Sequence, residues 1–134
     1  MRLKALVWIV RPGSAGDLEV LLLRRPDQRG GGEHPVTGKA DGGESAAACA
    51  VREAEEETGL RGELLDLRLA HRFRGKKGDF EEHTFLLRVP KGSEPVLSSE
   101  HVAHRWAREG EALEALDWEA HREALTAALK GWRG

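Results

Sequence analysis

The most constraining feature of the sequence is a helix-forming segment, 44–58, that begins with small residues and ends in crowded glutamates. Gly59 follows directly, and a glycine just past the last turn commonly ends a helix. Residues three and four positions apart share one face of a helix. Glu53, Glu56 and Glu57 are therefore predicted to point the same way, which makes this helix the chemical centre of whatever the chain folds into.

Placing carboxylates together at the end of a helix has two energetic costs. Like charges at these spacings destabilise a helix by roughly a few tenths of a kcal/mol per pair, and the C-terminal end of the helix dipole disfavours anions. A bound cation offsets both costs. Convergent carboxylate oxygens suit Mg²⁺ or Mn²⁺ rather than zinc or copper, and such an ion commonly binds substrate phosphates. Taken alone, the same glutamates also fit an ordinary solvated acidic face.

A glycine-punctuated loop before the helix decides between these two interpretations. Counting from Gly38, five residues precede Glu44 and seven more precede Arg52. The whole segment 38–60 fits the pattern G-x5-E-x7-R-E-U-x-E-E-x-G-U, where U is an aliphatic or small apolar residue and Ala54 is a light U. By this pattern, the chain resembles the Nudix hydrolase family.

The resemblance implies a fold and a reaction. Nudix proteins have a mixed central sheet flanked by helices, an α/β/α sandwich. They hydrolyse a nucleoside diphosphate linked to another moiety, with a divalent metal held by the signature helix. Water attacks a phosphorus atom while the metal neutralises charge and orients the nucleophile. The cofactor implied for this chain is Mg²⁺ or Mn²⁺.

The resemblance also implies roles for individual residues. Arg52 and Glu44 match a salt bridge that braces the loop against the helix, and Arg52 is counted with the catalytic residues. The proton of the attacking water is expected to pass to Glu56 or to a glutamate outside the signature. The implied metal-binding groups are the Gly38 carbonyl and the carboxylates of Glu53, Glu56, Glu57 and Glu100.

Short segments outside the signature extend the resemblance to the branch that contains dihydroneopterin triphosphate diphosphatase and related nucleoside-triphosphate pyrophosphohydrolases. In that branch, a glutamate at the position of Glu100 completes the metal site and acts in catalysis, and residues like Arg24 and Thr37 approach the substrate. The chain departs from the branch at 33–35, where Glu-His-Pro replaces a usual tryptophan. Recognition of the base or pteridine is therefore left open. In chain order, the segments are 20–25, 36–38, 82–85, 99–102 and 105–106.

Three functions follow from these patterns. The first is hydrolysis of a nucleoside triphosphate or a similar triphosphate ester. The second is hydrolysis of a dinucleoside polyphosphate or a nucleotide sugar such as ADP-ribose. The third is a module that binds nucleotides without turnover; such modules generally lose a signature glutamate, and all are present here. The expected partner is a nucleotide or pteridine polyphosphate, and the expected state is a monomer or homodimer.

Composition limits the remaining possibilities. The 134 residues amount to one domain, 1–134, with 23 acidic and 21 basic side chains and a net charge of −2. That balance argues against nucleic-acid or membrane binding. The apolar start, 3–10, is too short to span a bilayer. The lone Cys49 excludes an internal disulfide and fits a reducing cytoplasm.

The remaining segments show strands and helices without strict alternation, which predicts an α+β fold or a layered α/β/α sandwich. Turn residues separate the first two strands, and a polar glycine-rich stretch, 24–33, is predicted to be a mobile surface loop. The predicted strands cover 3–10, 18–23, 64–73, 83–89 and 102–107, and the later helices cover 109–116 and 118–129.

Several single residues allow both a functional and a structural interpretation. Glu81 and Glu82 compete with Glu100 for the role of extra carboxylate. The basic residues between 72 and 77 form either a phosphate-attracting rim or a solvated hairpin tip. Trp8, Trp106 and Trp118 are predicted to be core residues, with a nucleotide-lining role open for one of them. The six scattered histidines indicate no zinc site, and Cys49 is predicted to pack rather than react.

Overall fold

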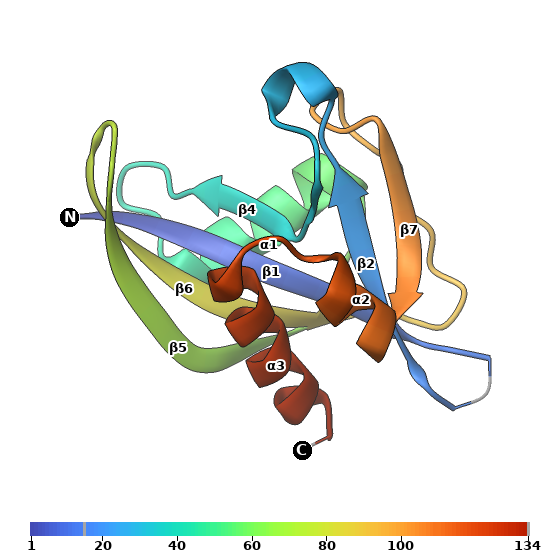
Figure 1. The fold of residues 1–134 in the computed structure, drawn as a ribbon. Coiled ribbons are helices and arrows are strands. Elements are labelled where there is room, and N and C mark those ends of the chain that lie inside the picture. The colour runs from blue at the N-terminus through green and yellow to red at the C-terminus, as the bar shows by residue number, and fades with distance from the viewer. Residues whose placement is uncertain (15, 134) are drawn as a thin grey trace.

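The structure, a computed structural model, describes residues 1–14 and 16–133. Helices cover both faces of a mixed seven-stranded sheet (Figure 1). In chain order, the elements are β1 (Arg2–Pro12), β2 (Leu18–Arg24), a 3-10 turn (Asp27–Arg29), β3 (Glu33–His34), β4 (Val36–Lys39), α1 (Ala46–Thr58), β5 (Glu63–Gly75), β6 (Gly78–Arg88), β7 (Ala103–Arg108), α2 (Glu109–Ala115) and α3 (Glu119–Arg133).

Strand β1 lies at the centre of the sheet and changes partner along one edge. It runs parallel to β6 from Arg2 to Val10. Its other edge pairs antiparallel with β4 over residues 4–7 and then with β2 over residues 10–12. The sheet order is β3-β2-β1-β6-β5, with β4 added to β1 and β7 added to β2. Because β4 and β2 share the same edge of β1 in succession, the residues of β4 are placed beside the end of β2.

Alternation along β1 supplies both hydrophobic cores, since successive side chains of a strand point to opposite faces. The even-numbered residues 6–10 pack with Leu125 of α3 in one core. The odd-numbered residues 5–9 pack with Ala50 and Ala54 of α1 in the other. These three layers confirm the predicted α/β/α sandwich.

Helix α1 is bounded by two local signals. The Ser45 hydroxyl accepts a hydrogen bond from the Ala48 backbone N–H at 3.1 Å, which caps the first turn. At the other end, Gly59 has φ 70° and its N–H donates to the Glu55 carbonyl at 2.8 Å. The predicted helix began at residue 44; it starts two residues later because Ser45 is the cap rather than a helical residue.

Most other predicted elements are present with shifted ends. Strands β5 and β6 both extend toward a tight turn at Lys76 and Lys77, which lengthens them beyond the predicted ranges. The prediction missed β3 and β4, which have two and four residues and too short a pattern to recognise. Within residues 1–14 and 16–133, no helix has the length and apolar character needed to cross a membrane.

Candidate active site

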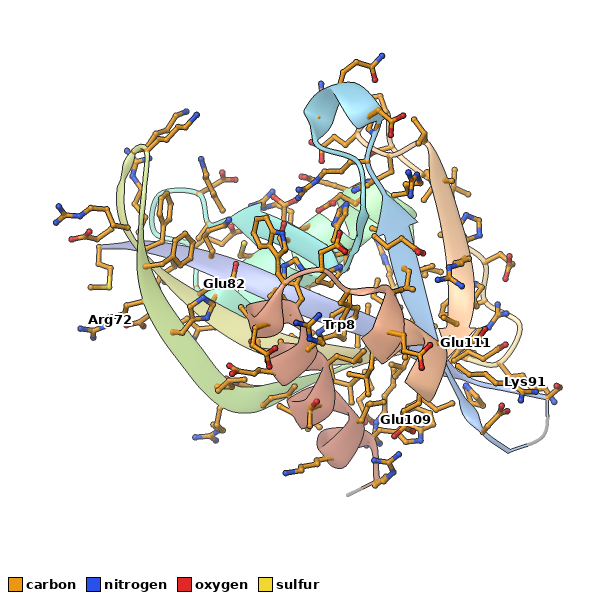
Figure 2. All side chains as sticks on the ribbon, viewed as in Figure 1. Trp8, Arg72, Glu82, Lys91, Glu109 and Glu111 are labelled. Atoms are coloured by element: carbon orange, nitrogen blue, oxygen red, sulfur yellow. The ribbon has the colours of Figure 1, made fainter. Side chains whose placement is uncertain are left out.

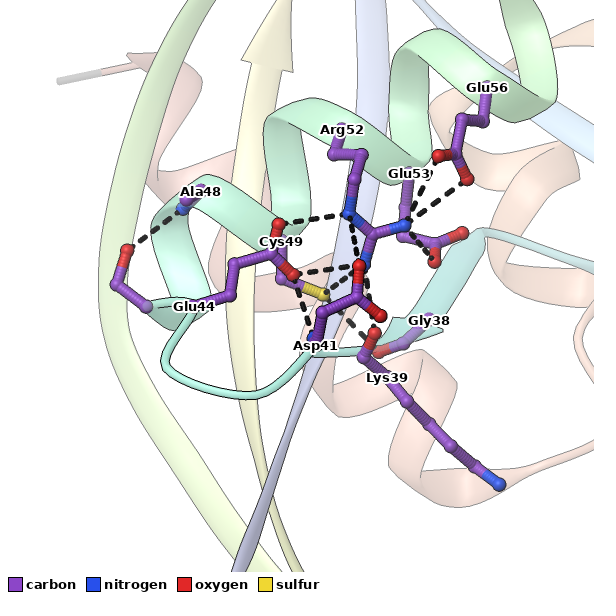
Figure 3. Close-up of polar contacts among 10 residues, drawn as sticks. Gly38, Lys39, Asp41, Glu44, Ala48, Cys49, Arg52, Glu53 and Glu56 are labelled. Carbon is purple, nitrogen blue, oxygen red and sulfur yellow. Dashed lines mark hydrogen bonds and ion pairs between the residues drawn. The ribbon is translucent and has the colours of Figure 1, made fainter.

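Arg52 ties the loop after β4 to α1 (Figure 3). Its Nε and Nη2 each donate to the Glu44 carboxylate at 2.9 Å, and Nη2 also donates to the Lys39 carbonyl at 3.0 Å. The Asp41 backbone N–H donates to the same carboxylate at 3.0 Å. These hydrogen bonds, that of Arg52 first, hold the pKa of Glu44 down at about 2. The brace expected from the sequence is therefore present.

The remaining nitrogen of Arg52 reaches along the helix toward the other glutamates. Nη1 donates to Glu53 Oε1 at 3.0 Å and to Glu56 Oε2 at 3.2 Å. One guanidinium thus links the loop to two of the predicted metal-binding carboxylates, and it positions both. The pKa of Arg52 is raised, mainly by the hydrogen bond to Glu44.

Gly38, on β4, lies directly against the Glu53 side chain. A Cβ placed on Gly38 would lie 2.2 Å from Cδ of Glu53, far inside van der Waals contact. The Cys49 thiol packs beneath, with Sγ 3.6 Å from the Gly38 carbonyl oxygen. Burial raises the pKa of Cys49 to about 11, so this thiol is a packing group rather than a nucleophile. Glycine is required at position 38 because the carboxylate occupies the space of a side chain.

Glu57 is the buried carboxyl group of the site. Only 4% of its surface is exposed, and its Oε2 has no hydrogen-bond partner among the described residues. Its Oε1 lies 3.8 Å from Nε2 of His101. One atom each of Glu57, Glu100 and His101 lie within 4.8 Å of one another. Burial, followed by a hydrogen bond with Glu53 and the charges of Glu53 and Glu100, raises the pKa of Glu57 to about 9.

Glu55 and Glu56 show how exposure varies along the same helix. Glu55 pairs with Arg61 on the surface, away from the cluster, as the helical spacing predicted. The Glu56 side chain is 58% exposed, and among the described residues its hydrogen bonds come from Arg52. Glu56 is thus accessible to solvent in a way that Glu57 is not.

Two adjoining hollows lie near these carboxylates and share Arg25, Trp118 and His121. The glycine-loop hollow, of about 280 Å³, is otherwise lined by Arg29, Gly30, Gly31, Gly32, Glu33, His34 and Asp117. The aromatic hollow, of about 370 Å³, is otherwise lined by Lys4, Thr37, His71, Phe73, Glu82 and Ala120.

Each hollow approaches the acidic site through one residue. The ring of His34 lies 4.9 Å from that of His101, which neighbours Glu57. Thr37 lines the aromatic hollow on the α3 side of the sheet, whereas its neighbour Gly38 faces α1, since neighbouring strand residues alternate. The aromatic hollow is linked to the acidic site through Arg25, which lines both hollows and whose charge acts on the pKa of Glu57.

Arg25 is half-buried where the two hollows meet. In the part of the chain that the structure describes, no carboxylate oxygen lies within 4.0 Å of its guanidinium, whereas Arg24 lies 3.7 Å from Asp27. The other arginines without such a pair, Arg2, Arg29 and Arg68, are exposed. A half-buried guanidinium without a counter-ion is suited to an anionic ligand.

The NUDIX domain model matches residues 1–128 of the sequence. The chain belongs to the Nudix family. The expectation of an enzyme of the hydrolase class, acting on pyrophosphate bonds, is thereby confirmed.

Solved structures similar to this Nudix chain share its fold over nearly the whole length. The Ap4A hydrolase of Caenorhabditis elegans has a TM-score of 0.83 and 23% identity, covering 100% of this chain and 99% of that one. The dihydroneopterin triphosphate pyrophosphohydrolase of Escherichia coli has a TM-score of 0.77 and 25% identity, covering 92% and 91%. The second agrees with the branch that the sequence resembles.

A curated relative matches over part of its length. The octanoyltransferase of Myxococcus xanthus is 39% identical over 122 residues, which is 87% of this chain and 34% of that protein. The chain therefore spans about a third of the curated relative that it matches.

The predicted ligand groups of this Nudix site fit a hard divalent cation, because all of them are oxygens. Three of the carboxylates come from α1, the Gly38 carbonyl comes from β4, and Glu100 comes from the loop before β7. The partnerless Oε2 of Glu57 and the close approach of Glu53 to Gly38 indicate a cluster arranged around a positive charge. His101 joins the group without having been predicted, and the roles of the individual ligands stay predictions.

The basic hairpin between β5 and β6 has its own counter-ions. Arg72 lies 3.0 Å from Glu81, and Arg74 lies 3.1 Å from Asp79. All four charges lie on the hairpin itself, and Arg72 points outward (Figure 2). The structure therefore favours the solvated-tip interpretation of these two arginines over a phosphate-attracting rim.

The structure changes the sequence-based view of four residues at the site. Arg25 lines both hollows, although Arg24 was the arginine named for the substrate. Trp118 is 66% exposed and lines both hollows, which favours the nucleotide-lining alternative over a core position, whereas Trp8 is completely buried as predicted. His34 and His101 meet only through folding, so no local spacing could have paired them.

Proposed function

We propose that this Nudix hydrolase is a divalent-metal-dependent pyrophosphohydrolase that cleaves a phosphoanhydride bond of a nucleoside triphosphate or a similar nucleoside diphosphate derivative. The observation that carries the proposal is a group of carboxylates that lies next to an arginine of opposite charge. The carboxyl cluster around the buried Glu57 adjoins a hollow whose half-buried Arg25 has no carboxylate partner among the described residues. A metal polyphosphate carries both complementary charges.

The groups that would hold Mg²⁺ or Mn²⁺ are the Gly38 carbonyl, Glu53, Glu56, Glu57 and Glu100. When bound, the ion supplies charge neutralisation at the phosphates and a lowered pKa of water. Arg52 positions Glu53 and Glu56 through Nη1, so its contribution to catalysis is to fix the carboxylates. Arg25 and Thr37 line the aromatic hollow and would contact the polyphosphate. Arg24 stays a predicted substrate contact.

The proton of the attacking water needs an acceptor that solvent can reach. Glu56 and Glu100 are both exposed, whereas Glu57 is buried. We therefore propose that Glu56 or Glu100 acts as the general base. Arg52 Nη1 donates a hydrogen bond to the Glu56 carboxylate at 3.2 Å, which orients this exposed group next to the cluster.

The two hollows support a second candidate reaction. A dinucleoside polyphosphate, or a nucleotide sugar such as ADP-ribose, has a bulky group at each end of its phosphates, and two hollows flank Arg25 here. The C. elegans neighbour hydrolyses Ap4A, a compound of the first of these classes. We also propose that residues 1–134 act as one domain, as a monomer or homodimer, in the cytoplasm, where the buried unpaired Cys49 stays reduced.

One substrate panel separates these possibilities. Purified protein is incubated with Mg²⁺ and with nucleoside triphosphates, pteridine triphosphate, dinucleoside polyphosphates or ADP-ribose, and the products are separated. Pyrophosphate and a monophosphate from a triphosphate support the proposal. AMP and ribose 5-phosphate from ADP-ribose support the second reaction. Tight nucleotide binding with no product from any compound supports a binding-only module and contradicts both reactions.

A further inference from the structure

Glu82 is a buried carboxylate that makes no hydrogen bond with the described residues, and it faces the aromatic hollow. It lies on β6 next to β1 and close to the start of α3 (Figure 2). Only 7% of its surface is exposed. It forms two long ion-pair contacts, with Lys4 Nζ at 4.0 Å and, when that ring is protonated, with His71 Nε2 at 3.9 Å, and both exceed hydrogen-bond distance. A ligand in the hollow that offers N–H donors would supply the hydrogen bonds that these contacts leave unmade.

The adjacent carboxylate shows the difference. Glu81 points to the opposite face of β6, since neighbouring strand residues alternate. It accepts hydrogen bonds from Arg72 at 3.0 Å and contacts His83 Nε2 at 2.8 Å. Glu81 is half-buried and has hydrogen-bond partners on β5 and β6, whereas Glu82 is buried, has none among the described residues, and its acceptor capacity is open to a ligand.

Two stacked pairs of flat side chains line the same hollow. Near the start of α3, the Trp118 and His121 rings stack with centroids 5.4 Å apart and planes inclined by 21°. On β5, His71 and Phe73 stack with centroids 5.5 Å apart and planes inclined by 30°. All four side chains line the hollow, and the indole is 66% exposed. Such walls fit a planar ring, which gains stacking energy against an aromatic face.

The hollow also contains the arginine proposed to bind phosphate. Arg25 lines it together with Glu82. A ligand whose phosphates contact Arg25 could therefore place its ring in this hollow, next to Glu82.

We infer that Glu82 recognises the 2-amino-4-oxopyrimidine edge of the substrate's ring, as found in guanine and in pterins. The two carboxylate oxygens accept two parallel hydrogen bonds, which requires adjacent ring N–H and amino donors. Guanine and pterins carry that pair. Adenine and cytosine place a lone pair beside their amino group, and uracil flanks its single N–H with carbonyl oxygens. The inference rests on the proposed function, because it names the base of that substrate.

The first test compares hydrolysis of GTP and ATP by the wild type, Glu82→Gln and the matched control Glu81→Gln. A bidentate base contact contributes about 10- to 100-fold of discrimination. We expect kcat/KM to favour GTP over ATP by that factor in the wild type and in Glu81→Gln. The neutral amide of Glu82→Gln, with a single acceptor oxygen, should abolish the preference by lowering turnover of GTP only. Equal use of GTP and ATP by the wild type, or an unchanged ratio in Glu82→Gln, overturns the inference.

A binding measurement separates failure of this inference from failure of the proposed function. Calorimetric titration with GMP and AMP in Mg²⁺ needs no turnover. If the protein hydrolyses no substrate, the proposed function is contradicted, and the titration still tests the role of Glu82. Tighter binding of GMP, lost in Glu82→Gln and kept in Glu81→Gln, supports the role of Glu82. Equal affinities, or no binding of either, overturn it. Glu82→Asp withdraws the carboxylate but keeps its charge beside Lys4, and it should weaken the preference even if the amide variant does not fold.

A third comparison distinguishes the two sources of this chemistry. The wild-type kcat/KM values for GTP and for dihydroneopterin triphosphate are measured under one condition. Both rings carry the same edge, so both should lose efficiency by a similar factor in Glu82→Gln. A loss confined to one of them assigns the hollow to that ring, and a loss on neither contradicts the inference.

Discussion

The signature segment 38–60 and the aromatic hollow differ in how their charges are satisfied. In the signature segment, one arginine joins loop and helix, and Glu44, Glu53 and Glu56 all contact Arg52 within the protein. In the hollow, Arg25 and Glu82 both lack hydrogen-bonded partners among the described residues, and Trp118 is exposed. In the signature segment, the protein itself supplies the partners of the charged side chains, except at Glu57. In the hollow, we propose that a ligand supplies them.

The largest effect is expected from removing the buried carboxyl group of the signature. Glu57→Gln should lower kcat by at least about 100-fold, since it removes a carboxylate that would hold the cation. Glu55→Gln, on the same helix but paired with Arg61 at the surface, should leave kcat unchanged. Circular dichroism checks that both variants fold. EDTA should abolish wild-type activity and Mg²⁺ or Mn²⁺ should restore it; equal rates for the two variants contradict the metal-site assignment.

A smaller but still large effect is expected at Gly38. Gly38→Ala places a methyl group 2.2 Å from Cδ of Glu53, so the carboxylate must move. We expect kcat to fall by roughly tenfold or more and the unfolding free energy to fall by about 1–3 kcal/mol. Gly42→Ala, where nothing lies within 4 Å of the added Cβ, is the control. Similar kinetics and urea midpoints for the two variants would show that β4 adjusts freely.

The two arginines at the end of β2 test which region holds the phosphates. Arg25→Gln should raise KM about tenfold, because it removes a charge-assisted contact from the cleft. Arg24→Gln should raise KM less, since Arg24 faces Asp27 instead of the hollows. Steady-state kinetics with one triphosphate decides the order. A larger effect at Arg24 would support the sequence-based prediction that Arg24 contacts the substrate. It would also place the substrate phosphates nearer to β7.

The smallest effect concerns the pH dependence of the brace. The pKa of Glu44 lies at about 2 in the folded state, below the ordinary value of 4.5, because Arg52 stabilises the carboxylate. Its contribution to stability is present above about pH 4.5 and is lost as the pH falls toward 2. The unfolding free energies of the wild type and Glu44→Gln should therefore converge over that range in urea titrations. A difference that stays constant with pH would contradict the ionic brace.

The features that the sequence predicted are those with local causes. Helix α1 and its glycine stop depend on residues within 38–60, so the local pattern located them, and the brace between Glu44 and Arg52 was implied by the family resemblance that this segment carries. The layered sandwich was expected from the mixture of strands and helices and from the same resemblance. The local structure of the signature could therefore be predicted from its sequence.

The features that the sequence did not predict depend on contacts between distant segments. Trp118 resembles a core residue in composition, and only its position in front of α3 shows that it faces a hollow. Glu81 and Glu82 are adjacent residues of the same type, so the sequence alone does not separate their roles. Because neighbouring strand residues point to opposite faces, Glu82 lies in the aromatic hollow and Glu81 lies on the other face of the sheet.

The parallel pairing of β1 with β6 has a consequence for the order in which the molecule assembles. Arg2 pairs with Phe80 and Val10 pairs with Arg88, so the central strand acquires this neighbour only after the whole signature segment has been made. Such distant closure slows folding. During synthesis, we expect the signature helix to be made before the sheet that supports it is complete. A purified chain that ends at Lys77 should therefore be cleaved by protease within α1 more readily than the full chain.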